Sequence, residues 1–130
     1  MKDQKLTQFS NAKLNLTLHV TGVRTSGFHD LDSLVAFPTI YDVLTFKKTT
    51  QPSLIIKGPF ATALKKSASS NKNTISRAIN LMGSEAEGVE VTLTKNLPIA
   101  AGIGGGSSNA ASTLLALSRL FSISLPRPDK

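Results

Sequence analysis

The sequence contains no cysteine and no tryptophan, and it has only two histidines. The absence of cysteine excludes disulfides and thiolate metal sites, and two histidines alone disfavour a zinc site. Aromatic residues are few, with six Phe and one Tyr, and they form no stacking motif. No stretch is apolar and long enough to span a membrane, and the first residues lack the apolar core of a signal peptide. We therefore expect a cytoplasmic protein.

Length and charge suit a single folded domain with an anionic partner. The chain has 130 residues, 40% of them hydrophobic and 18% charged, which is typical of one modest globular domain. Its formal net charge of +7 fits a polyanion, either nucleic acid or a polyphosphate such as ATP. The lysines are scattered rather than grouped in runs, so charge alone leaves both partners open.

Strands dominate the first part of the predicted fold and helices the second. Alternation of apolar and polar residues predicts strands over 12–20 and 88–94, and short runs separated by Pro38, Pro52 and Gly58-Pro59 predict further strands over 34–37, 41–46 and 53–57. A loop is predicted over residues 22–30, and an exposed connection over residues 61–72. Helical periodicity predicts helices over 73–82 and 107–121, the second with Ala110, Leu114, Leu117 and Phe121 facing inward. This order indicates an α+β fold with helices on one face of a mostly antiparallel sheet.

The most informative stretch spans residues 97–111, where four of the five residues from Gly102 to Gly106 are glycine and a helix-forming run follows. A glycine-rich loop that ends at a helix N-terminus leaves unpaired N–H groups that favour a phosphate. The simpler alternative is a glycine-rich turn closed by a serine cap. No Lys-Ser or Lys-Thr follows the glycines, so this is no Walker A loop, and Ile103 interrupts a Rossmann pattern. The hydroxyl of Ser107 or Ser108 would cap the helix or contact Mg²⁺.

A phosphate at this loop needs positive charge from elsewhere, and Lys13 is a candidate. The alternation places Lys13 and Asn15 on one polar face, two positions apart. A lysine on the polar face of a strand is also ordinarily just solvated. His29, after Gly27 and Phe28, is equally consistent with an ordinary loop histidine.

Together these segments resemble the GHMP kinase family. Ala12-Lys13-Leu14-Asn15-Leu16, Val20-Thr21-Gly22-Val23-Arg24, Gly27-Phe28-His29 and the loop over 98–111 occur in that order. Matching segments at 31–35 and 73–78 extend the resemblance over nearly the whole chain. It implies the ribosomal-protein-like N-terminal domain of these kinases over residues 1–125, followed by a polar tail at 126–130. It also implies ATP, Mg²⁺ and a small-molecule substrate as partners, with neither a membrane nor a nucleic acid.

Within this family, the chain more specifically resembles the branch that phosphorylates a cytidine-diphosphate-linked methylerythritol in non-mevalonate isoprenoid synthesis. It implies that Lys13 is catalytic, that Asn15 lies at the acceptor hydroxyl, and that Phe28 and His29 hold the cytosine. Relatives usually carry Tyr at the position of Phe28, so stacking is kept here and a phenol contact is not. The residues that it implies for ATP are Asn73, Lys95, Pro98, Ala101, Gly102, Ile103, Gly104, Gly105, Gly106, Ser107 and Ser108.

The sequence departs from the family pattern near its end. The family's catalytic aspartate, in a Gly-Ala-Asp-Val-Pro-like segment, has no counterpart, since Asp129 lies in a Pro-Arg-Pro-Asp-Lys tail. We expect the chain to correspond to the first half of such a kinase, without the C-terminal domain and with apolar surface exposed. Two alternatives stay open: an RNA-binding module with the same layout, and a non-catalytic fragment that binds no nucleotide.

The missing aspartate gives the first prediction. The purified 130-residue chain should show little or no kinase activity by itself, because no base is present to take the proton of the acceptor hydroxyl. A coupled assay of ADP release with the methylerythritol substrate measures this. Steady phosphorylation of that substrate would contradict it.

Overall fold

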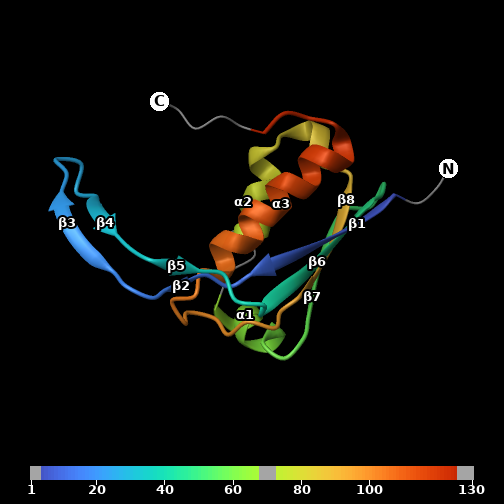
Figure 1. Ribbon diagram of the computed structural model, residues 1–130. Helices are drawn as coiled ribbons and strands as arrows, with labels where there is room; N and C mark the ends of the chain where they lie inside the picture. The colour runs from blue at the N-terminus through green and yellow to red at the C-terminus, as the bar shows by residue number, and fades with distance from the viewer. Residues whose placement is uncertain (1–3, 68–72, 126–130) are drawn as a thin grey trace.

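The computed structural model describes residues 4–67 and 73–125, and the polar tail with Asp129 lies outside them. Its main sheet has four strands in the order β1 (Lys5–Asn11), β6 (Tyr41–Lys48), β8 (Val89–Thr94) and β7 (Ser53–Lys57). The β1–β6 and β6–β8 pairs are antiparallel, and β7 pairs with β8 in parallel. Helices α2 (Thr74–Leu81) and α3 (Gly105–Phe121) lie together on one face of this sheet (Figure 1). The predicted α+β fold is therefore confirmed.

The core lies between this sheet and the two helices. Alternate residues of β6 and β8 face inward, and Leu44, Phe46, Val91 and Leu93 are all fully buried. They pack with residues of both helices, including Leu117 of α3. The alternation that predicted β8 therefore placed the apolar face correctly.

Besides α2, two short helices lie between β7 and β8 in the sequence. The chain continues from β7 into α1 (Ala61–Ser67), so the prediction of an exposed connection over 61–72 is wrong for its first part. Residues 68–72 lie outside the described part of the chain. A short 3-10 helix η2 (Ser84–Ala86) follows α2, whose start is capped by the Asn73 side chain.

The helix predicted over 107–121 begins two residues earlier, at Gly105. Its buried face is also shifted by about one position, because Asn109, Thr113, Ala116, Leu117 and Leu120 are buried. Of the four residues predicted to face inward, only Leu117 is fully buried, and Ala110, Leu114 and Phe121 are half-buried. The difference arises because this helix buries two polar side chains that a purely apolar pattern leaves out.

The continuous strand predicted over 12–20 is wrong. The missed strand β1 ends at Asn11, and the chain then enters a narrow arm (residues 14–36) that projects from the body (Figure 1). Its paired strands are β2 (Leu14–Asn15) with β5 (Val35–Ala36), and β3 (His19–Val23) with β4 (His29–Asp32). Between the two pairs, Ser33 Oγ donates to the Thr17 carbonyl and the Leu34 N–H donates to Thr17 Oγ1. These side-chain bonds compete with a regular ladder and interrupt it.

The arm exposes much of its apolar surface. Side chains that the alternation placed on a half-buried face are more than half exposed, among them Leu16 at 60%, Leu18 at 54% and Val20 at 61%. The prediction that these side chains lie on a half-buried face is therefore wrong, and no described element packs against them.

The core makes a direct prediction about stability. Phe46→Ala should lower the free energy of unfolding by about 3–5 kcal/mol, because it removes a fully buried ring from the centre of the sheet. Urea denaturation measures the loss. Phe37→Ala is the matched control, since Phe37 is 67% exposed and its truncation should change stability by no more than about 0.5 kcal/mol. Equal losses in the two variants would contradict the packing described.

Candidate functional site

A cavity of about 360 Å³ lies where the glycine-rich loop meets the start of α2 and the end of β8. The structure brings ten of the eleven residues expected to bind ATP into its lining. These are Asn73, Lys95, Pro98, Ala101, Gly102, Ile103, Gly104, Gly105, Gly106 and Ser107. Ser108 is not among the lining residues, and its Oγ instead accepts a 2.8 Å hydrogen bond from Ser10 Oγ of β1.

The loop delivers the N-terminus of α3 to this cavity without a side-chain cap. Gly104 precedes the helix in the left-handed conformation, with φ at 70°, and no side chain caps the first turn. The expectation that Ser107 or Ser108 would cap the helix is therefore wrong. Helix N–H groups without intrahelical partners attract anions, and the helix dipole adds to the effect. This geometry suits a phosphate group.

Lys13 lies beside the same loop although the two are far apart in sequence. Its backbone N–H donates a 2.8 Å hydrogen bond to the Ile103 carbonyl, and a Cβ added to Gly104 would come within 3.3 Å of Lys13 Cβ. Its Nζ donates to Asn15 Oδ1 at 3.4 Å. The pairing of Lys13 with Asn15 is thus as expected, and the charged side chain is placed next to the helix N-terminus.

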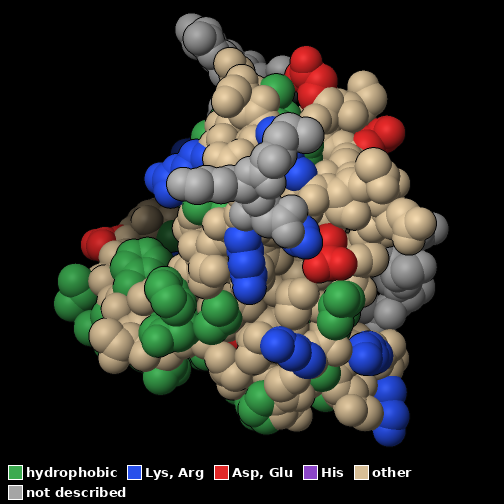
Figure 2. Space-filling view, turned by 90° about the vertical axis from the view of Figure 1, so that its right-hand side faces the viewer, with side chains coloured by type: hydrophobic (Ala, Val, Ile, Leu, Met, Phe, Trp, Pro, Cys, Tyr) green, Lys and Arg blue, Asp and Glu red, His purple; other side chains and the backbone are tan. Residues whose placement is uncertain are grey.

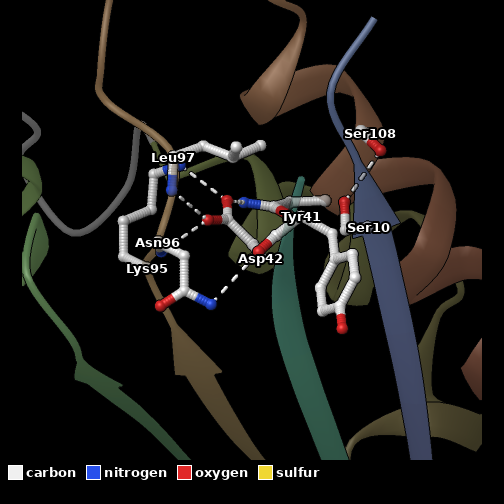
Figure 3. A network of polar contacts seen from close by, with 8 residues as sticks. Ser10, Tyr41, Asp42, Lys95, Asn96, Leu97 and Ser108 are labelled. Carbon is white, nitrogen blue, oxygen red and sulfur yellow. Dashed lines mark hydrogen bonds and ion pairs between the residues drawn. The ribbon is translucent and has the colours of Figure 1, made fainter. Parts of the chain in front are cut away.

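Beneath the loop, the Asp42 carboxylate forms a buried polar network (Figure 3). Its Oδ2 accepts from Lys95 Nζ at 2.6 Å and from Asn109 Nδ2 at 3.0 Å. Its Oδ1 accepts from the backbone N–H groups of Asn96 and Leu97, both at 2.8 Å. Asp42 is fully buried and Lys95 is 3% exposed, so the pair is shielded from water.

Asp42 is not among the site residues predicted from the sequence, although its position carries a signal. Asp42 continues the inward-facing series of Leu44 and Phe46, and Lys95 continues that of β8. The ladder pairs Val43 with Thr94, so one step further the two charged residues stand opposite each other on the inner face. A charged residue in register with buried apolar neighbours is the pattern that identifies such a pair.

The rest of the cavity lining includes residues from α1, from the start of α2 and from the loop. Asn73 lines it, but its Oδ1 already accepts from the Ile75 N–H at 2.9 Å as the cap of α2. Leu64 reaches the cavity from α1, the helix that the sequence analysis missed, and Ala100 lines it with φ at 54°. Left-handed backbone at a residue with a Cβ stores strain, which is typical of loops shaped for a ligand.

Phe28 and His29 lie elsewhere. They stand at the tip of the arm, where Phe28 is 74% exposed and His29 begins β4. They are not among the residues that line the cavity, and the arm carries them away from the body (Figure 1). Their assignment to cytosine binding stays a prediction.

The described residues offer little for a metal ion. None of those that line the cavity is Asp or Glu, and residues 4–67 and 73–125 contain no group of three or more His, Asp or Glu suited to hold a metal. Ser107 lines the cavity, and its hydroxyl oxygen is a type of ligand that Mg²⁺ binds. It would be one ligand among several supplied by nucleotide phosphates.

On the face shown in Figure 2, positive charge is spread out rather than gathered at one patch. Figure 2 shows Lys and Arg side chains in separate groups over one face, with hydrophobic side chains gathered at one side of the view. Within the described residues, no helix is long and apolar enough to cross a membrane. The cavity beside the loop is therefore a more specific candidate site than the surface charge.

An α+β domain with a glycine-rich loop, an uncapped helix N-terminus and a lysine beside it defines a candidate phosphate-binding domain. Comparison with known proteins agrees. Residues 73–130 match the family model of the GHMP kinases N terminal domain. The chain is 46% identical over 94% of its length to the 4-diphosphocytidyl-2-C-methyl-D-erythritol kinase of Ruegeria pomeroyi, covering 42% of that protein. It is also 47% identical over 91% of its length to the 4-diphosphocytidyl-2-C-methyl-D-erythritol kinase of Rhodospirillum rubrum, covering 39% of that protein.

Solved structures give the same picture. A crystal structure of 4-(cytidine 5'-diphospho)-2C-methyl-D-erythritol kinase superposes with a TM-score of 0.68 at 34% identity, over 89% of this chain and 41% of that one. Mevalonate pyrophosphate decarboxylase from Streptococcus pyogenes superposes with a TM-score of 0.62 at 17% identity, over 94% of this chain and 39% of that one, which shows the shared fold alone. The chain is thus similar to GHMP kinases, and it spans about two fifths of the length of the curated relatives that it matches.

The loop geometry makes a paired prediction. Gly102→Ala and Gly104→Ala each place a Cβ on left-handed backbone, with φ at 69° and 70°, and each should cost about 1 kcal/mol of stability for that reason. At Gly102 the new Cβ meets nothing within 4 Å, whereas at Gly104 it meets Lys13 Cβ at 3.3 Å. Urea denaturation should therefore show the larger loss for Gly104→Ala, and equal losses would contradict the contact with Lys13.

Proposed function

We propose that this chain forms the ATP-binding part of a kinase that phosphorylates 4-diphosphocytidyl-2-C-methyl-D-erythritol at its 2-hydroxyl, a step in isoprenoid precursor synthesis. The observation that carries the proposal is the cavity at the uncapped start of α3, with Lys13 beside its rim. The similarity along 94% of the chain to a relative with that name supports the substrate. ATP as the phosphoryl donor favours the cytoplasm as the place of the reaction.

The proposed roles follow from the chemistry of phosphoryl transfer, which depends mainly on positioning and on stabilising negative charge. The N–H groups at the start of α3 would hold the phosphate oxygens of ATP, since they have no side-chain cap to compete with. The Lys13 ammonium, beside the loop, would neutralise charge on the transferred phosphoryl group. Asn15, which accepts a hydrogen bond from Lys13, would orient the acceptor hydroxyl.

Magnesium would supply further neutralisation of phosphate charge when bound with ATP. The Ser107 hydroxyl, which lines the cavity, would be its ligand from this chain. Mg²⁺ commonly keeps several waters and takes substrate phosphates as ligands, so one protein oxygen is a workable contribution.

The cytidine part of the substrate would bind at the arm. Phe28 is exposed enough to stack on a base, and His29, next to it, would hydrogen-bond the cytosine edge. The Tyr that relatives usually carry at the position of Phe28 would add a hydroxyl contact that Phe28 lacks. This chain would therefore rely on stacking. We therefore propose a substrate that reaches from the arm toward Lys13.

Binding of Mg-ATP tests the proposal directly. Isothermal titration calorimetry should detect Mg-ATP binding by the chain, and Lys13→Ala should weaken it about 10-fold or more, because a charge-assisted contact to phosphate is lost. Lys57→Ala is the matched control. Lys57 is exposed on β7, so this substitution removes the same charge at a position away from the loop. Its affinity should equal that of the parent chain.

The alternative of an RNA-binding module predicts a different pattern. Affinity for a generic RNA would then fall steeply with salt, and Lys13→Ala and Lys57→Ala would weaken binding alike. That pattern, with no binding of Mg-ATP by the parent chain, would contradict the kinase proposal.

A further inference from the structure

The Asp42 carboxylate connects three segments that meet beneath the glycine-rich loop (Figure 3). One oxygen holds the backbone of Asn96 and Leu97, where the chain leaves β8 and the loop begins. The other oxygen holds Lys95 and Asn109, the latter in the second turn of α3. Both ends of the loop are therefore fixed to one side chain, while the loop itself consists largely of glycine.

We propose that Asp42 is a positioning residue for the phosphate-binding loop, a role that rests on the proposed function. Glycine-rich backbone has little conformational preference of its own, so a loop of this composition needs fixed ends to keep its N–H groups aimed at one point. Asp42 supplies this by clamping the start of the loop to α3. The side chain is fully buried, so it acts on the ligand through the loop and not by contact.

The negative charge of Asp42 is needed, not only its shape. Four donors converge on its two oxygens, and a carboxylate is acceptor-only. An amide in its place keeps one acceptor and turns an NH₂ group toward Lys95 and Asn109. Asn109 Oδ1 is buried without a partner among the described residues, so a rotated Asn109 amide could accept from that NH₂ group. Lys95 would nonetheless lose its counter-charge in a buried position.

Lys95 connects this clamp to the cavity. Its Nζ lies 3.3 Å from where a Cβ on Gly105 would stand, so the ammonium supports the first residue of α3 from below. Its backbone is equally confined, because the Lys95 N–H donates to the Lys57 carbonyl at 2.7 Å and a Cβ on Gly58 would meet Lys95 backbone at 2.9 Å. The Lys95 backbone is therefore held in place at the point where β8 leads into the loop.

Hydrogen exchange of two reporter amides tests the clamp without any nucleotide. The Lys13 N–H donates to the Ile103 carbonyl and the Ser108 N–H donates to the Gly104 carbonyl. Neither amide contacts Asp42, yet both depend on the loop conformation. In Asp42→Asn both should exchange about 10-fold or more faster relative to the amides of β8, as expected when charge-assisted bonds at the loop ends are lost. The control Glu85→Gln removes an exposed carboxylate in η2 and should leave both ratios unchanged.

A second variant covers the case in which Asp42→Asn fails to fold. Asp42→Asn combined with Lys95→Met removes both buried charges, and removing a whole buried pair is tolerated far better than breaking one. The double variant should fold and still show fast exchange at the two reporter amides. If its loop amides are as protected as in the parent chain, Asp42 serves only to neutralise Lys95 and the proposal is overturned.

Mg-ATP affinity provides the functional arm, measured by calorimetry on folded Asp42→Asn. Binding about 10-fold weaker than in the parent chain supports the proposal, and equal affinity overturns it. If the parent chain binds no Mg-ATP, the proposed function fails while the exchange data still decide whether Asp42 positions the loop. If the ratio of reporter exchange to β8 exchange is the same in Asp42→Asn as in the parent chain, the positioning role is overturned in every case.

Discussion

The ion pair of Asp42 and Lys95 is the constraint on which the candidate site depends. Taking two charges out of water costs several kcal/mol per ion, and only close geometry with additional hydrogen bonds offsets that cost. Here the additional bonds come from Asn109 and from the backbone at the start of the loop. The groups that make the buried charges tolerable are therefore the ones that place the loop over the cavity.

Local patterns in the sequence predicted the elements whose structure is decided locally. The alternation over 88–94 gave β8, and the run of glycines before a helix-forming segment gave the loop and the start of α3 within two residues. The Asp42–Lys95 pair joins residues 53 positions apart, so the local pattern can mark each residue as a buried charge but cannot show which residue is its partner. Only the register of β6 against β8 brings them together.

The arm shows where periodicity stops being informative. Alternation over residues 12–20 predicts that apolar side chains share a face, and it carries no information about whether another layer covers that face. The main sheet has α2 and α3 over its apolar side, whereas the arm has no such layer among the described elements. The same pattern thus describes a buried strand in β8 and an exposed ribbon in the arm. The missed helix α1 has the opposite cause, since its short sequence, rich in Lys and Ala, has too few apolar residues to show a helical stripe.

The charge that a phosphate would meet at the site does not come from the overall excess of lysine. Lys95 is already balanced by Asp42, so among the described residues the positive character next to the loop comes from the α3 N-terminus and from Lys13. The Lys13 N–H is bonded to the Ile103 carbonyl within the loop, which fixes the lysine backbone to the structure that presents the helix N–H groups. The positions of the loop and of the Lys13 backbone are therefore coupled, and under the proposed roles a loop positioned by Asp42 would also keep Lys13 near a bound phosphate.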